Sequence, residues 1–229
     1  MPTFVFKLLI VTAKDLLGNT KSTINRNIMN FFSIDCSTDI ESLFVKIESK
    51  TFNKVLQSDK HNNDSLMVQI LEFFRENDIK FEDLSQIYIN QGPGNFSRLR
   101  SSLATAKGIS LSKNLKLFGY NTFIWSCANF FNKSNFIYSF IKFRNKYFIK
   151  KFDSKLGGSF AVEEIERNEI IKKYDNKFKV IPKNLEDQFD EKILKLNNLA
   201  VVDLNHNVLE FLRLKGLLDE EFIKPLYIS

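Results

Sequence analysis

The pattern of apolar and polar positions divides the chain into short strands and amphipathic helices. Three β-rich runs come first, and helices then alternate with strands, as parallel crossover connections require. From Met29 onward the pattern predicts strands at 30–35, 42–48 and 52–57, a helix at 62–77, a strand at 86–90, a helix at 95–113, a strand at 115–119 and a helix at 122–131. This order predicts an α/β lobe built on a mixed sheet.

The second half of the chain repeats this order in a shorter form. It is predicted to contain strands at 136–142 and 147–153 that form a hairpin, a helix at 162–174 and a strand at 178–181. A repeated order of elements indicates two related lobes, the second one reduced. We therefore expect an N-terminal lobe over 29–131 and a smaller C-terminal lobe over 132–229, whose final helix could return to the first lobe.

The turn between the strand at 86–90 and the next helix is the most distinctive motif. Gly92-Pro93-Gly94 breaks the apolar run, and Asn95 is a favourable helix N-cap residue. Unpaired backbone N–H groups at such a helix start, from Asn95 to Arg98, could receive a phosphate or a carboxylate. The segment matches neither the dinucleotide-binding fingerprint nor the P-loop, so a structural turn is the simpler interpretation.

The two helices on either side of that strand carry more apolar and small positions than one core face needs. The first has two adjacent apolar stripes, formed by Leu66, Ile70 and Phe73 and by Met67, Leu71 and Phe74. The second has a core stripe of Phe96, Leu99, Leu103 and Ala106, and a row of small residues at Ser101, Thr105, Gly108 and Ser112. A row of small side chains allows another helix to approach closely. An internal helix neighbour and a partner protein both explain this row.

The composition is that of a globular, basic chain. Of 229 residues 24 are Phe, and Gly and Pro number only 8 and 4. These counts predict a substantial core without a long low-complexity linker. The formal charge of +6 is compatible with an RNA-related task. Lysines dispersed over a solvated face explain the charge more simply.

Cysteine and histidine usage argues against a metal site or a disulfide framework. Cys36 and Cys127 suit a reducing cytoplasm, and His61 and His206 lie far apart without a partner at ligand spacing. The apolar run at 4–11 is too short for a membrane span. We expect a cytoplasmic protein, and our hypothesis is that translation starts at Met29, which would make residues 1–28 an annotation artefact.

Residues 90–108 resemble the hallmark run of the TsaB (YeaZ) family, dimerisation subunits of the bacterial tRNA threonylcarbamoyladenosine machinery. The family usually reads Gly-Pro-Gly-Ser-Phe-Thr-Gly-Leu-Arg and then Ile-Gly-Leu-Ala-Thr-Ala-Lys-Gly. This chain has Asn95, Ser97 and Arg98 in place of the Ser, Thr and Gly. Weaker matches follow the family order: Ile34-Asp35-Cys36-Ser37-Thr38, His61 with Ser65 and Leu66, and Pro225-Leu226-Tyr227-Ile228.

The resemblance implies a Gcp-like domain with the ribonuclease-H-like fold of actin-like ATPases (the ASKHA fold). It implies a non-catalytic scaffold that activates the catalytic subunit TsaD, which transfers threonylcarbamoyl to the tRNA adenosine next to the anticodon. TsaE is the expected third partner, tRNA is reached through the complex, and a homodimer through the same surface is an alternative. The implied interface lies on the two helices, at Leu66, Met67, Ile70, Phe74, Leu99, Ser101, Leu103, Thr105 and Gly108.

The same fold places a few residues where relatives of the superfamily approach nucleotide. These cofactor candidates are Asp35, Ser37, Thr38, Gly92 and Gly94. Catalysis would require further converging groups, but Cys36 stands where an ATPase needs glycine and Lys142 where a second acid would stand. We expect no cofactor or metal on this chain alone, with ATP and a metal in the partner subunits. An actin-like-fold ATPase or small-molecule kinase and a tRNA-binding module remain the alternative functions.

Overall fold

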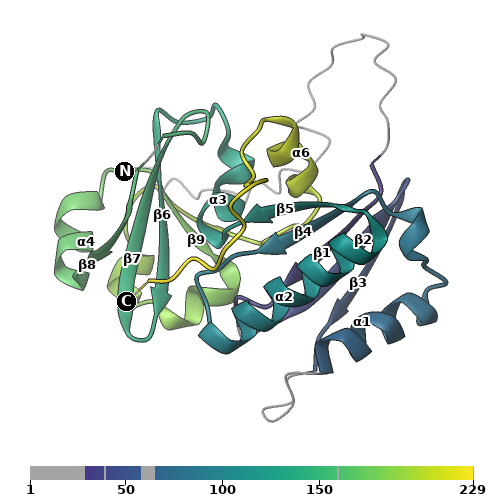
Figure 1. Cartoon of the computed structure of the whole chain (residues 1–229). Helices are drawn as coiled ribbons and strands as arrows, with labels where there is room; N and C mark the ends of the chain where they lie inside the picture. The colour runs from purple at the N-terminus through teal and green to yellow at the C-terminus, as the bar shows by residue number, and fades with distance from the viewer. Residues whose placement is uncertain (1–28, 39, 58–64, 159, 229) are drawn as a thin grey trace, which may run out of the picture.

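Two five-stranded mixed sheets form the framework of the protein, as the computed structural model shows (Figure 1). The structure describes residues 29–38, 40–57, 65–158 and 160–228. The predicted extension at 1–28 and the first residues of the predicted helix at 62–77 lie outside these ranges. The predicted fold class, α/β with two related lobes on mixed sheets, is confirmed.

The first sheet has the strand order β3-β2-β1-β4-β5. Its strands are β1 (Phe31–Asp35), β2 (Ser42–Ile47), β3 (Lys50–Val55), β4 (Gln86–Asn90) and β5 (Lys116–Tyr120). β1 pairs antiparallel with β2 and parallel with β4, so it occupies the centre of the sheet. Every residue of β1 and β4 is buried. Central strands covered on both faces are expected to be apolar throughout.

Helices cover both faces of the first sheet. α1 (Ser65–Glu76) and α2 (Phe96–Lys113) pack on the face that carries Phe32, Ile34 and Ile87. The opposite face contacts α3 (Thr122–Cys127), η3 (Ala128–Phe130) and the core of the second lobe. The alternation of side chains along each strand separates these two cores, because successive residues point to opposite faces.

The second sheet repeats the connectivity of the first, with the order β10-β9-β6-β7-β8. Its strands are β6 (Phe136–Phe143), β7 (Lys146–Asp153), β8 (Val162–Ile165), β9 (Lys179–Pro182) and β10 (Leu199–Val202). Its helices are shorter than α2: α4 (Arg167–Tyr174), η4 (Lys183–Gln188), α5 (Glu191–Leu194) and α6 (Val208–Leu214). The second lobe is thus reduced in its helices and in the length of its outer strands.

The predicted helix at 162–174 is wrong in its first part. Val162 to Ile165 form the edge strand β8, which pairs antiparallel with β7 through Lys150 and Tyr147. The two exposed glutamates between Val162 and Ile165 suit an edge strand, and α4 begins only at Arg167. The predicted helix at 122–131 shortens to α3 followed by the 3-10 turn η3. The strand β10 was not predicted, and the final helix, which was expected without bounds, is α6.

The segment after β10 returns to the first lobe. His206 lies between the Ser33 hydroxyl, 2.9 Å from Nδ1, and the Ser42 hydroxyl, 3.3 Å from Nε2. Its ring stacks on Phe44 with centroids 5.1 Å apart. On α6, Glu210 accepts an ion pair from Lys46 of β2.

The C-terminal residues continue along the edge of the first sheet. Asp219 forms an antiparallel bridge with Gly119 of β5, and the Leu226 N–H donates to the Gln91 carbonyl at 2.7 Å. The end of the chain therefore lies against the loop that precedes α2. None of the helices described here is long and apolar enough to span a membrane.

Candidate functional site

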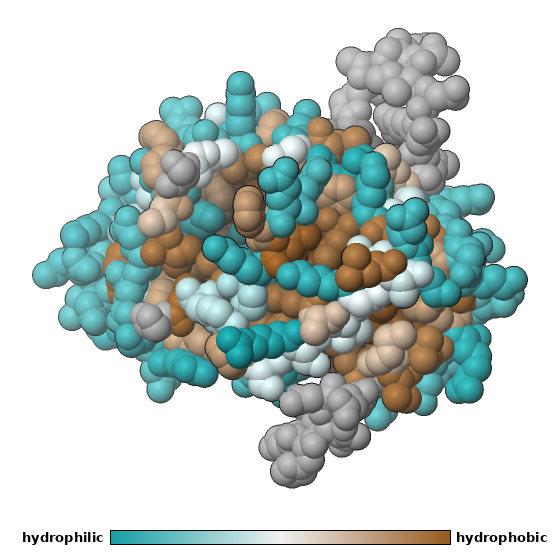
Figure 2. All heavy atoms as spheres, viewed as in Figure 1, coloured by the Kyte–Doolittle hydropathy of each residue, from teal (hydrophilic) through white to brown (hydrophobic). Residues whose placement is uncertain are grey.

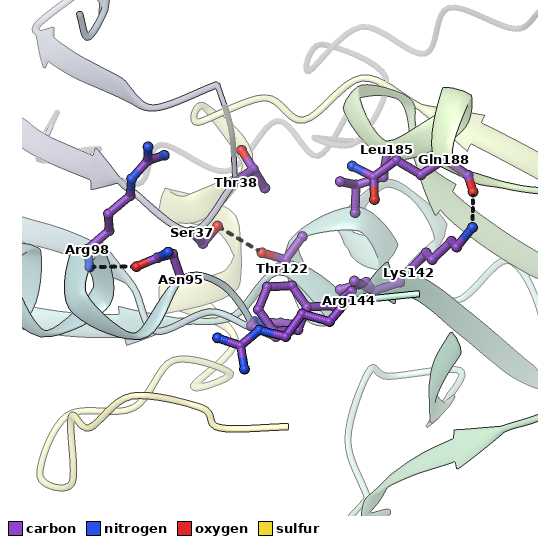
Figure 3. Close-up of a pocket in the computed structure, with 12 residues that line it drawn as sticks. Ser37, Thr38, Asn95, Arg98, Thr122, Lys142, Arg144, Leu185 and Gln188 are labelled. Atoms are coloured by element: carbon purple, nitrogen blue, oxygen red, sulfur yellow. Dashed lines mark hydrogen bonds between the residues drawn. The ribbon is translucent and has the colours of Figure 1, made fainter. Parts of the chain in front are cut away.

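A cleft of about 290 Å³ opens between the two lobes, beside the ends of β1 and β4. Of the five residues predicted to approach a nucleotide, Ser37 and Thr38 line this cleft, whereas Asp35, Gly92 and Gly94 do not. Figure 3 shows its walls, which come from the turn after β1, the start of α2, the start of α3, the β6–β7 hairpin and η4. The residues that line it are Ser37, Thr38, Pro93, Asn95, Arg98, Thr122, Ile141, Lys142, Phe143, Arg144, Leu185 and Gln188.

Asp35 holds the turn beside this cleft. Its Oδ1 accepts from the Ser37 hydroxyl at 2.6 Å and from the Ser37 N–H at 3.0 Å. The side-chain amide of Asn90 donates to Ser37 Oγ and to Thr122 Oγ1, at 2.9 and 3.0 Å. Burial raises the pKa of the Asp35 carboxyl, and the hydrogen bonds from Ser37 partly oppose this shift. The acid therefore ties β1 to β4 and α3.

The glycines at the start of α2 are explained by close packing. A Cβ added to Gly94 would lie 2.0 Å from the Ser37 carbonyl oxygen, a distance that no side chain tolerates. Gly92 has a φ of +110°, and its N–H donates to Asn90 Oδ1 at 2.9 Å. Gly92 and Gly94 thus let the loop pass close to the turn at Ser37. Thr38 lies at the upper wall of the cleft and donates from its hydroxyl to the Ile40 carbonyl at 3.1 Å (Figure 3).

Asn95 is confirmed as the N-cap of α2. Its Oδ1 accepts from the backbone N–H groups of Ser97 and Arg98, at 3.0 and 3.3 Å. The expectation that these two groups are unpaired was wrong, because the cap already satisfies them. The Arg98 guanidinium, at the position where the family keeps glycine, forms an ion pair with Glu41 at 2.9 Å.

The cations of the cleft do not converge on one point. Figure 3 shows the side chains of Arg98, Lys142 and Arg144 extending in different directions. Lys142 donates to the Gln188 carbonyl at 2.7 Å, across the wall of the cleft. A Mg²⁺-nucleotide site needs oxygen ligands for the ion and donors gathered around phosphates. The described lining residues include no carboxylate, so they do not fit this group.

The residues that the structure describes contain no cluster of three or more His, Cys, Asp or Glu side chains that could hold a metal ion. His206 is buried between Ser33 and Ser42, and burial lowers its pKa to about 3. His61 lies outside the described residues. Cys36 and Cys127 are buried free thiols whose pKa is raised by burial. These groups have a structural explanation in the two cores.

Five of the nine predicted interface residues lie inside the protein. Leu66, Ile70 and Phe74 of α1 and Leu99 and Leu103 of α2 face the first sheet and are buried. They form the core beneath the helices and are therefore not a free surface, which corrects the expectation for these five. The wide apolar stripe of α1 was divided wrongly between core and surface, because spacing alone does not fix the phase of a helix against its sheet.

The outward side of the two helices forms the second candidate site. We call it the outer helix face. It consists of Met67, Val68 and Leu71 of α1 and of Ser101, Ala104, Thr105, Gly108 and Leu111 of α2. Val68, Leu71 and Leu111 are 55%, 49% and 85% exposed, and a Cβ on Gly108 would meet nothing within 4 Å. Figure 2 shows apolar residues gathered over α1 and pale, small residues mixed with hydrophilic ones along α2.

Met67, Ser101, Thr105 and Gly108 belong both to the predicted interface and to the outer helix face. The other four residues of this face were not in the predicted interface: Val68, Leu71, Ala104 and Leu111. The register of the buried residues would have found them, because positions that lie between the buried residues of α1, or between and after those of α2, turn away from the sheet.

Comparison with known proteins found sequence similarity over the middle of the chain. A family model described as TsaD, tRNA N6-adenosine threonylcarbamoyltransferase, matches residues 54–136, which include α1 and α2. The tRNA threonylcarbamoyladenosine biosynthesis protein TsaB of Buchnera aphidicola subsp. Baizongia pistaciae is 32% identical over 85 residues. This match covers 36% of the chain and 38% of the Buchnera protein.

Two solved structures share the fold over most of the chain. YeaZ from Pseudomonas aeruginosa superposes with a TM-score of 0.64, at 15% identity, over 87% of this chain and all of the YeaZ chain. A second structure, described as an uncharacterized protein with similarity to peptidase YeaZ from the same organism, gives a TM-score of 0.62 at 14% identity over 88% and 100%. The chain is thus similar in sequence to TsaB over about a third of its length, and it shares the fold of YeaZ over most of its length.

Proposed function

We propose that this chain is a non-catalytic subunit of the machinery that makes threonylcarbamoyladenosine in tRNA. In this proposal it binds TsaD through the outer helix face and enables TsaD to transfer threonylcarbamoyl to the adenosine next to the anticodon. TsaE is the third partner, and tRNA binds to the assembled complex. ATP and a metal belong to the partner subunits. The sequence similarity to TsaB over 85 residues and the fold shared with YeaZ support a role in this biosynthesis.

The outer helix face is the observation that carries the proposal. Exposed apolar side chains from α1 lie next to a helix with small residues at Ser101, Ala104 and Gly108. Small residues allow the backbones of two helices to approach, and contiguous exposed apolar surface marks interaction sites on soluble proteins. A second pair of helices packed here would complete a four-helix arrangement.

The interlobe cleft supports a non-catalytic role. Asp35 is bonded to Ser37, Arg98 is paired with Glu41, and Lys142 donates to Gln188. Three of the groups that could act on a phosphate thus already have a structural partner among the described residues. We therefore expect no nucleotide turnover by the isolated chain. Measured turnover at a catalytic rate would favour the alternative of an actin-like-fold ATPase or small-molecule kinase.

Co-expression with TsaD of the same organism tests the proposal. We expect a complex on size-exclusion chromatography and more tRNA modification by TsaD in the presence of the chain. The variant Gly108→Trp should abolish the complex without unfolding the protein, because position 108 is open to solvent. The matched control is Lys172→Trp on α4, which is also exposed and lies in the other lobe. Full binding by Gly108→Trp would contradict the proposed surface.

A further inference from the structure

We infer that the outer helix face selects a partner helix rich in acidic residues and disfavours a second copy of this chain. The inference rests on the proposed function, because it specifies the chemistry of the partner that covers this face. It is carried by the distribution of charge on α2 and on the elements beside it.

All four charged residues of α2 are basic. They are Arg98, Arg100, Lys107 and Lys113, and the helix contains no Asp or Glu. Arg98 pairs with Glu41 and Lys113 with Glu82, so carboxylates of this chain already balance these two. Among the described residues no carboxylate forms an ion pair with Arg100 or Lys107.

Arg100 is held in place although it is exposed. Its Nε donates to the Tyr227 hydroxyl at 2.9 Å, and its guanidinium lies 3.8 Å above the centre of the Phe96 ring. Phe96 and Tyr227 stack on each other with centroids 5.1 Å apart. The C-terminal segment thus fixes a positive charge at one end of the outer helix face. A charge that is held in one geometry needs less ordering when a partner binds.

Arg100 and Lys107 flank the point where a second helix can come closest. They lie four residues before and three residues after Ala104, so all three share one side of α2. Gly108 and Leu111 continue the same exposed stripe. Any helix that packs against Ala104 and Gly108 therefore meets both cations.

A second copy of this chain would bring like charges together. In a two-fold symmetric contact centred near Ala104, Arg100 of one copy approaches Lys107 of the other, and the same pair occurs twice. The neighbouring helix α1 does not neutralise this charge. Its Glu76 pairs with Lys54 of β3, and its Glu72 has a basic residue, Arg75, three positions further along the same helix. Like charges that are brought together in an interface oppose association, whereas acidic residues at these places would form ion pairs.

The surroundings of the two cations favour a protein over RNA as the partner. Met67, Val68, Leu71 and Leu111 are exposed apolar residues on the same face. Phosphate-binding surfaces gain little from such side chains, whereas helix packing buries them.

Reversal of the two charges tests the inference. The double variant Arg100→Glu/Lys107→Glu should weaken binding to TsaD about tenfold or more. The control Lys133→Glu/Lys155→Glu changes the net charge equally at exposed positions away from α1 and α2 and should bind as the unmodified chain does. Sedimentation velocity should show that the unmodified chain is monomeric. An equimolar mixture of the unmodified chain with the reversed variant should associate more than either protein alone.

The outcomes separate this inference from the proposed function. If TsaD does not bind the unmodified chain, the proposed function fails. If TsaD binds both the unmodified chain and the reversed variant equally, the acidic partner is ruled out although the proposed function stands. A stable homodimer of the unmodified chain through α2, or a loss of tRNA affinity without any loss of TsaD binding, would also overturn the inference. Circular dichroism and thermal melting confirm that each variant is folded.

Discussion

The glycines of this chain show how one residue type serves two purposes. Gly94 is required because the Ser37 carbonyl lies where its Cβ would be, whereas Gly108 has empty space around it. The first glycine allows two loops to pack against each other. The second leaves room for another helix to pack closely on α2. Within a helix, a glycine is less favourable than an alanine.

Alanine at these two positions should therefore have opposite effects on stability. Gly94→Ala should lower the free energy of unfolding by about 1–3 kcal/mol, because the loop must move away from Ser37. Gly108→Ala should raise it by about 1 kcal/mol through helix propensity. Urea denaturation of both variants measures the two changes. An unchanged midpoint for Gly94→Ala would show that the close approach to Ser37 is not as tight as the structure has it.

His206 should make the stability of the protein depend on pH. Burial lowers the pKa of this imidazole from 6.5 to about 3 in the folded chain. Between these values the unfolded chain binds a proton that the folded chain does not, so stability is complete above pH 6.5 and falls as the pH is lowered towards 3. The slope from this residue approaches about 1.4 kcal/mol per pH unit.

The variant His206→Gln isolates this contribution. It should be less stable than the unmodified protein at pH 7, but its free energy of unfolding should fall less between pH 6.5 and 5. Asp35 and Glu41 have a raised pKa and act in the opposite direction, but they are present in both proteins and cancel in the comparison. Parallel pH profiles of the two proteins would contradict the neutral, buried state of His206.

At the scale of single elements, α2 has one face for the core and one for solvent. Leu103 is buried beneath the helix, whereas Leu111 is 85% exposed. Leu103→Ala should lower the free energy of unfolding by about 2–4 kcal/mol through the cavity it leaves. Leu111→Ala should change it by less than about 0.5 kcal/mol.

Binding to TsaD should depend on these two leucines in the reverse order. Leu111→Ala should weaken the complex although the fold is intact, and Leu103→Ala should bind normally below its melting temperature. Thermal melts and size-exclusion chromatography of the same preparations give both readings. A Leu103→Ala protein that is as stable as the unmodified chain would mean that the helix faces are assigned wrongly.

Elements could be predicted from the sequence where local signals agree. The bounds of β4 and the cap at Asn95 were predicted correctly, because an apolar run, a glycine-proline turn and an N-cap residue all indicate the same boundary. β8 was mistaken for helix because a four-residue run carries little periodicity and its pairing with β7 is not local. The exposed side of α1 was predicted only in part, at Met67, because both of its stripes are apolar.

At the scale of the whole molecule, the repeat of one element order in both halves predicted the two related sheets. The return of the C-terminal segment to the first lobe depends on contacts between residues far apart in sequence, such as His206 with Ser33 and Leu226 with Gln91. Sequence patterns predict local structure, whereas such contacts follow from the packing of complete lobes. The interactions in the candidate cleft could not be predicted from the sequence for the same reason. The ion pair between Arg98 and Glu41 joins residues that are far apart in the sequence.

The most direct test of the account is tRNA modification by purified TsaD with and without this chain, under conditions where TsaE, ATP and tRNA are present. We expect the unmodified chain to increase threonylcarbamoyladenosine formation, Lys172→Trp to do the same, and Gly108→Trp not to do so. Equal modification by TsaD in the absence and presence of the chain would contradict the scaffold role, and equal stimulation by Gly108→Trp would contradict the outer helix face as its basis.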